Sequence, residues 1–153
     1  MKLYTYWRSS AAYRVRIALA LKGLNFESVA VNIAPGADEQ WARVYAEVNP
    51  QMRVPALELA SGEILTQSMA IIDYLEETHP APALLPSDPV ERARCRAFAD
   101  TIACDIHPLN NLSVLTTLRE DFGADRAAVT RWYHGWIERG FAALESLAAA
   151  RPA

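Results

Sequence analysis

The sequence has little of several features that mark particular classes of protein. Its 153 residues include two cysteines and three histidines, and 15 basic side chains nearly balance 18 acidic ones. This balance, with no basic run, argues against a nucleic-acid binder held by phosphate neutralisation. The apolar stretches are far shorter than the roughly 20 residues of a membrane span, and arginines interrupt any signal-peptide core. We therefore expect a cytoplasmic protein with a small-molecule partner and neither nucleic acid nor membrane.

The cysteines and histidines show no pattern of a metal site. Cys95 and Cys104 lie in a segment that we expect to be helical, and at about 100° per residue their spacing directs them to opposite faces. We therefore expect two buried, structural, reduced cysteines. His79, His107 and His134 lack metal-ligand spacing, so no metal is predicted.

Hydrophobic residues make up 52% of the chain, which allows a sizeable core. The first part alternates strand and helix patterns, and Gly23 is placed to end the first helix. We expect strands at 2–7 and 27–33, helices at 10–22, 41–48 and 67–79, and a hairpin of 54–59 with 64–65. In the second of these helices Trp41, Val44, Tyr45 and Val48 recur at i, i+3, i+4 and i+7, the spacing of one amphipathic face. A right-handed crossover would pair the first two strands in parallel, and the hairpin adds an antiparallel edge. The order predicts an α/β thioredoxin-like domain with a mixed four-stranded sheet and helices on both faces.

The rest of the sequence predicts only helix. The expected division is a thioredoxin-like domain at 1–79, a proline-rich linker at 80–89 and an all-α domain at 90–153. Asp88 should cap a long helix that Pro108 kinks. A final helix from Asp125 carries a wide apolar stripe, which two helices alone cannot bury.

Three local features could bear chemistry. Ser9 and Ser10 lie where a strand gives way to a helix, a position that favours a bound anion or thiolate. Gln67 and Ser68 open another helix and suit a carboxylate. Both pairs could equally be simple helix caps. The Val54–Pro55 bond is a candidate cis peptide that would present backbone groups to an extended peptide.

Several motifs together resemble one family. The run from Ser9 to Leu19 closely resembles the signature Ser-Ser-Cys-x-x-Arg-Val-Arg-Ile-Ala-Leu of zeta-class glutathione transferases, which include the maleylacetoacetate isomerases. Four further segments are similar to segments of the same family: Asn49–Pro50, Val54–Pro55, 67–76 and 105–113. The resemblance covers almost the whole chain. One departure is Ala11, where the family usually has cysteine, and we interpret it as a shift in rate or preferred substrate.

The resemblance implies glutathione as the cofactor and assigns roles to particular residues. The thiolate would accept a hydrogen bond from Ser9, with Ser10 nearby, and these two would be the catalytic residues. The other implied glutathione contacts are Gln40, Val54, Gln67, Ser68, His107, Asn111 and Ser113. Arg8 and Arg14 are candidates for the substrate carboxylates, although Arg14 could equally form a structural ion pair.

The implied activity is glutathione-dependent cis–trans isomerisation of a small cis-enone diacid. Maleylacetoacetate, in tyrosine and phenylalanine catabolism, is favoured as the substrate. Relatives that act on maleylpyruvate carry arginines in the stretch around Ser113, and this chain lacks them. The alternatives are a maleylpyruvate isomerase, a transferase that conjugates or dehalogenates small electrophiles such as α-halo acids, and a non-catalytic binding protein of the same fold. The resemblance also implies a homodimer. Because a family segment expected after the apolar stripe is missing, we expect a truncated glutathione-transferase C-terminal domain.

Overall fold

The computed structural model describes residues 1–150, so the last three residues of the expected helical domain lie outside the described part. The chain divides into two compact units, the first comprising Met1–Leu85 and the second beginning at Pro86. Each unit is considered by itself below.

The first unit contains the predicted mixed sheet. Its strands are β1 (Lys2–Thr5), β2 (Glu27–Ala30), β3 (Ala56–Glu58) and β4 (Ile64–Thr66), in the order β2-β1-β3-β4. β1 and β2 are parallel, whereas β3 is antiparallel to both β1 and β4. The thioredoxin-like arrangement is therefore confirmed. β1 ends two residues before the predicted end, because the backbone turns away at Tyr6.

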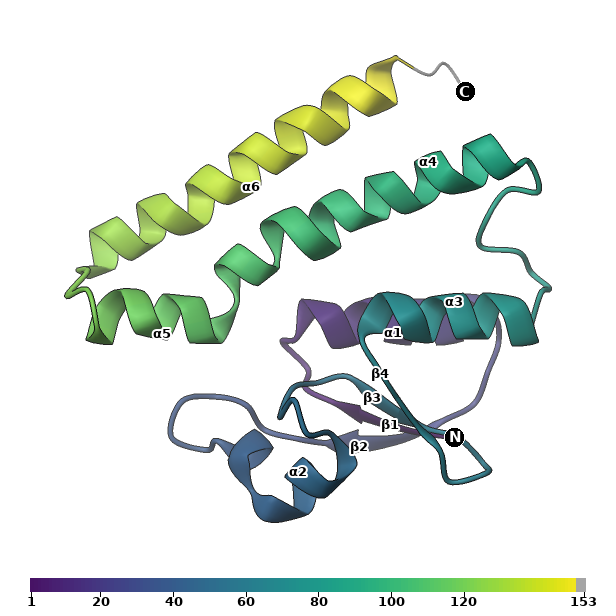
Figure 1. Cartoon of the computed structure of the whole chain (residues 1–153), viewed down its shortest axis with the longest axis horizontal. Coiled ribbons are helices and arrows are strands. Elements are labelled where there is room, and N and C mark those ends of the chain that lie inside the picture. Colours follow the sequence, from purple (N-terminus) through teal and green to yellow (C-terminus); the bar gives the residue numbers. More distant parts are fainter. Residues whose placement is uncertain (151–153) are drawn as a thin grey trace. The chain divides into compact units, whose positions relative to one another are not determined.

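Helices cover both faces of this sheet (Figure 1). α1 (Ser10–Leu21) and α3 (Ser68–Thr78) lie on one face, and α2 (Arg43–Val48) lies on the other, after the short 3-10 helix η1 (Glu39–Trp41). The core under α1 and α3 consists of Leu3, Val15, Ala18, Leu19, Leu57, Ile71 and Leu75. Its apolar residues come from β1 and β3 as well as both helices, which holds the start of α1 at the end of β1.

The second core, under α2, is smaller than the sequence suggested. It contains Val31, Tyr45 and Val54, each less than a tenth exposed. The periodicity placed Trp41 and Val44 on the same buried face, but they are 61% and 74% exposed. That part of the prediction is wrong, because the helix starts only at Arg43 and is too short to bury a full stripe.

The second unit is helical, with a break in its first long helix. It comprises α4 (Pro89–Asp100), the π-helix η2 (Thr101–Ile106), the 3-10 helix η3 (Pro108–Asn110), α5 (Leu112–Glu120) and α6 (Arg126–Ala149). Asp88 caps α4 as predicted, accepting from the Val90 and Glu91 amides. The predicted kink at Pro108 is a change of helix type, since proline lacks the amide that a continuous helix needs.

Both cysteines are exposed, so the expectation that they are buried is wrong. Cys95 lies on α4, none of whose residues is buried. The apolar stripe of α6 is also only partly covered: Val129 and Leu144 are buried, whereas Phe141 remains 47% exposed. Among residues 1–150, no helix combines the length and the apolar character that crossing a membrane would need.

Candidate active site

Ser9 directly precedes α1, at the end of the turn that follows β1. As the N-cap of α1, its Oγ accepts a hydrogen bond from the Ala12 amide at 3.2 Å. Its own amide donates to the Tyr6 carbonyl at 3.0 Å. Accepting a cap bond uses an oxygen lone pair and leaves the hydroxyl proton for donation. Capping and thiolate binding are therefore compatible in Ser9. Ser10 follows as the exposed first residue of α1.

The two arginine candidates differ in their surroundings. Arg8 is exposed, and its guanidinium carbon lies 5.7 Å from the centre of the Trp7 ring. Arg14 is half-buried and donates from Nε to Ser68 Oγ at 3.3 Å. This bond ties the second turn of α1 to the first residue of α3. It gives Arg14 a structural contact, whereas Arg8 is more accessible to a ligand.

The segment before β3 is held in place by buried polar side chains. Asn49, 2% exposed, donates from Nδ2 to the Arg53 carbonyl at 2.7 Å, and the Tyr45 hydroxyl donates to the same oxygen at 2.7 Å. Burial raises the pKa of Tyr45 to about 12, so it remains a donor. The Val54–Pro55 bond is cis, as the sequence suggested. Because β3 begins at Ala56, Val54 lies outside the strand ladder.

Gln67 stands at the start of α3 in an unusual backbone conformation. Its φ of 67° is in a region that residues other than glycine rarely adopt. Such conformations concentrate at ligand-binding positions. Its side chain does not cap α3 but donates from Nε2 to Gln51 Oε1 at 2.8 Å. Sequence reasoning missed Gln51, although its place directly after the Asn49–Pro50 landmark was a usable signal.

Gln40 is buried, with 4% of its surface exposed, and lies in η1. Its Nε2 donates to Asp38 at 3.4 Å, while its Oε1 has no partner within the described part of the chain. A buried polar atom without a partner is uncommon in a folded protein. Gln40 therefore has hydrogen-bonding capacity that a ligand could use after a small rearrangement.

The three candidate residues of the second unit lie around the break in its helix. Asn111 caps α5: its Oδ1 accepts from the Val114 amide at 3.1 Å and from the Ser113 hydroxyl at 2.6 Å. These bonds occupy the Asn111 oxygen and leave its Nδ2 group as a donor. His107 immediately follows the π-helix, a feature often found at functional sites.

Residues of α6 fix the segment at the helix break, through contacts that the sequence did not reveal. Trp132 donates from Nε1 to the Leu109 carbonyl at 2.8 Å, and Asn110 donates from Nδ2 to the Tyr133 carbonyl at 3.0 Å. Gly140 allows close approach to Ile106, because a Cβ there would overlap the Ile106 side chain. The segment carrying His107 is thus anchored on both sides.

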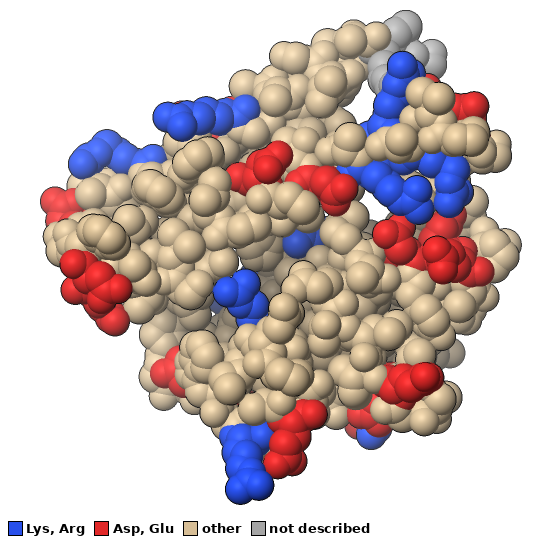
Figure 2. All heavy atoms as spheres, in the orientation of Figure 1, with Lys and Arg blue, Asp and Glu red and all other residues tan. Residues whose placement is uncertain are grey.

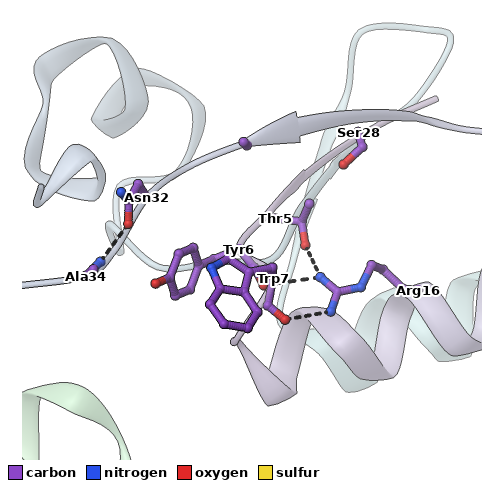
Figure 3. Close-up of a pocket in the computed structure, with 8 residues that line it drawn as sticks. Thr5, Tyr6, Trp7, Arg16, Ser28, Asn32 and Ala34 are labelled. Atoms are coloured by element: carbon purple, nitrogen blue, oxygen red, sulfur yellow. Dashed lines mark hydrogen bonds between the residues drawn. The ribbon is translucent and has the colours of Figure 1, made fainter.

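A separate cavity of about 560 Å³ lies beside the end of β1 (Figure 3). It is lined by Thr5, Tyr6, Trp7, Arg16, Ser28, Ala30, Asn32 and Ala34, none of which was a predicted site residue.

On the face shown in Figure 2, acidic and basic side chains are scattered among uncharged ones.

The thioredoxin-like fold and the polar residues at the starts of α1 and α3 are typical of glutathione transferases, and comparison with known proteins agrees with this class. Residues 1–77 match the family model "Glutathione S-transferase, N-terminal domain". The chain is 54% identical to maleylacetoacetate isomerase of Pseudomonas aeruginosa, over 96% of this chain and 69% of that protein. It is 49% identical to maleylpyruvate isomerase of a Ralstonia species, over 99% of this chain and 70% of that protein. The mouse maleylacetoacetate isomerase is 44% identical, with 95% and 64% covered.

Solved structures agree with the sequence relatives. A holo maleylpyruvate isomerase, described as a bacterial glutathione transferase of the zeta class, superimposes with a TM-score of 0.95 at 49% identity, covering 99% of this chain and 70% of that one. The maleylacetoacetate isomerase of Methylobacterium extorquens, with bound malonate and glutathione, gives 0.91 at 44% identity, covering 95% and 67%. The chain belongs to the glutathione S-transferase family, and within it to the zeta class.

Proposed function

We propose that this chain is a glutathione-dependent cis–trans isomerase that converts maleylacetoacetate to fumarylacetoacetate in tyrosine and phenylalanine catabolism. The observation that carries the proposal is Ser9, which caps α1 through its oxygen and keeps a hydroxyl proton at the helix N-terminus. A hydrogen bond and the positive end of the helix dipole both favour a thiolate there. The 54% identity to an isomerase of this name supports the substrate class.

The remaining residues of the first unit fit glutathione. Its bound thiolate would supply reversible addition to the conjugated double bond, which permits rotation before elimination. Ser9 donates its hydroxyl proton in a hydrogen bond that keeps the thiol deprotonated. Gln67 and Ser68 bind the γ-glutamyl carboxylate at the start of α3, and the Val54 backbone, outside the ladder, binds the cysteinyl portion in strand fashion.

Further candidate residues are assigned to glutathione or to the substrate. Gln40, with its unpartnered oxygen, is the candidate for a further polar contact to glutathione. The resemblance to zeta-class transferases also assigns His107, Asn111 and Ser113 to glutathione. Arg8 and Arg14 are assigned to the carboxylates of the diacid, and their charge also stabilises negative charge that develops on the substrate. Ser10 would act beside Ser9.

Maleylpyruvate is a second candidate substrate. It is favoured by the 49% identity to the Ralstonia maleylpyruvate isomerase and by the TM-score of 0.95 with a structure of that name. Both substrates are cis-enone diacids, so the same thiolate and carboxylate contacts would serve either.

The deciding experiment follows the ultraviolet absorbance of each diacid with a catalytic amount of glutathione. Isomerisation without loss of glutathione supports the proposal, and the ratio of kcat/KM for the two diacids identifies the substrate. Consumption of glutathione would instead indicate a conjugating transferase, and glutathione-dependent release of halide from an α-halo acid would indicate a dehalogenating one. Glutathione binding without turnover of either diacid or an α-halo acid would indicate a binding protein.

We also propose that the protein is a cytoplasmic homodimer. The two exposed cysteines form no disulfide in the described chain, which suits a reducing compartment. Light scattering coupled to size-exclusion chromatography would give the mass in solution, and a monomer mass would contradict the dimer.

A further inference from the structure

Arg16 lies on α1, within the Ser9–Leu19 signature, and the proposed function gives it no role. Its side chain runs back toward the start of the helix, as long helical side chains do. Nη1 donates to Thr5 Oγ1 at 2.8 Å and to the Tyr6 carbonyl at 3.1 Å, and Nη2 donates to the Trp7 carbonyl at 3.1 Å. Figure 3 shows the guanidinium facing these three consecutive residues. One planar group thus holds the end of β1 and the turn that follows it.

The Tyr6 carbonyl connects this group to Ser9. The same oxygen that accepts from Arg16 Nη1 also accepts from the Ser9 amide at 3.0 Å. A carbonyl oxygen has two lone pairs and can accept both bonds. Arg16 and Ser9, the residue that caps α1, therefore donate hydrogen bonds to the same carbonyl oxygen.

The geometry requires an arginine in particular. A guanidinium presents several N–H groups in a rigid plane and can satisfy acceptors on neighbouring residues together, whereas a lysine ammonium is a compact point charge. The Tyr13 ring supports the plane, with its centre 5.1 Å from the guanidinium carbon. The group is thus held from both sides, by the turn and by the first part of α1.

We infer that Arg16 is a positioning residue for thiol activation: through the Tyr6 carbonyl it keeps the Ser9 hydroxyl aimed at the glutathione sulfur. The inference rests on the proposed function for the identity of that sulfur. Its structural part, that Arg16 orders the turn at Ser9, is independent of any ligand.

The structural part is tested by amide hydrogen exchange measured by NMR on the chain without ligand. In Arg16→Gln, the Ser9 amide should exchange about tenfold faster or more, because a hydrogen bond from a charged group contributes roughly that factor. The matched control is Arg43→Gln, which removes an arginine that is paired with Glu47 on the exposed side of α2. Unchanged exchange at Ser9 in Arg16→Gln would overturn the inference.

The chemical part is tested by titrating the thiol of bound glutathione through its thiolate absorbance. Arg16→Gln should raise that pKa by about one unit, a typical size for losing a nearby stabilising group, and lower kcat about tenfold with little change in KM for the diacid. Affinity for S-methylglutathione, which has no thiol, should stay the same and shows that the glutathione site is intact. Arg16→Lys should be as impaired as Arg16→Gln. If Arg16→Lys kept the wild-type kcat and the wild-type exchange rate of the Ser9 amide, positioning by the planar guanidinium would be contradicted.

A second variant guards against poor folding of the Arg16 variants. Thr5→Val removes one acceptor of the guanidinium and nearly preserves shape, so it should change exchange and thiol pKa in the same direction by a smaller amount. Failure of the two proposals is distinguishable. If the wild-type chain shows no glutathione-dependent turnover, the proposed function fails, whereas faster Ser9 exchange in Arg16→Gln would still support the positioning role.

Discussion

Lys22, the C-cap residue of α1, and Glu76 of α3 form a buried ion pair, with 2.7 Å between Nζ and Oε2. The lysine side chain is fully buried and that of Glu76 is 8% exposed. Lys22 also donates to the His79 and Pro82 carbonyls, while Glu76 accepts from the Leu84 and Leu85 amides. The pair therefore ties the segment after α3 to the first unit, which extends to Leu85.

Breaking this pair should destabilise the first unit strongly. Glu76→Gln leaves the Lys22 charge buried without its counter-charge, and we expect a loss of about 3–5 kcal/mol in the free energy of unfolding. Urea unfolding followed by circular dichroism measures it. The matched control is Glu47→Gln, which breaks an exposed pair with Arg43 and should change stability by less than about 1 kcal/mol. Equal effects of the two variants would contradict the structural role assigned to Glu76.

The lowered pKa of the Glu76 carboxyl leads us to expect a loss of stability in acid. Burial acts to raise the pKa of Glu76, but hydrogen bonds from Lys22, Leu84 and Leu85 outweigh it and leave the pKa below the ordinary 4.5. A carboxyl whose pKa is lowered by folding stabilises the protein above its unfolded pKa, and that contribution disappears as pH falls through the folded value. Stability measured against pH should therefore fall below about pH 4.5. The fall should be shallower in Glu76→Gln, and parallel curves would show that another group is responsible.

Ser9→Ala should separate capping from catalysis. Loss of the hydroxyl should lower turnover by about 10²-fold, by analogy with removal of one hydrogen-bond donor to a developing anion. Loss of the cap should cost about 1 kcal/mol of stability. Asp125→Ala is the control, because Asp125 caps α6 through the Ala128 amide and should show the stability loss alone. Full turnover in Ser9→Ala would remove Ser9 from the proposed mechanism.

Gly140→Ala tests how closely α6 approaches the π-helix. A Cβ at Gly140 would overlap Cδ1 of Ile106, whose side chain is buried, so we expect a loss of about 1–3 kcal/mol. Gly135→Ala on the same helix meets nothing within 4 Å and should stabilise by about 0.5–1 kcal/mol. Thermal unfolding measures both. Adding Ile106→Val to Gly140→Ala removes the overlapping methyl and should recover part of the loss, and additive effects would argue against this contact.

Much of the fold was predictable because its signals are local. Asp88 and Asp125 cap their helices, since a cap depends on a hydrogen bond to an amide two or three residues away. The mixed sheet followed from the order of strands and helices, because crossover handedness and hairpin pairing leave few arrangements. The motif at Ser9 likewise indicates the family through its residue order alone.

The sequence misjudged burial where burial depends on a second element. Periodicity shows which residues share a helix face, but not whether anything covers that face. The spacing places Trp41 and Val44 on one helix face with Tyr45, yet only Tyr45 is buried. Cys95 and Cys104 were expected inside on their chemistry alone, yet both are exposed.

By itself, the sequence determined the thioredoxin-like topology, the helix caps and the family, because each is written in residue order over short distances. Only the tertiary structure decided that Lys22 pairs with Glu76, that Gln51 bonds to Gln67 and that Ile106 packs on Gly140. It also decided that Arg16 and Ser9 share the Tyr6 carbonyl. These contacts need particular side chains to meet after the chain has folded, and no local spacing specifies which partner a side chain will reach.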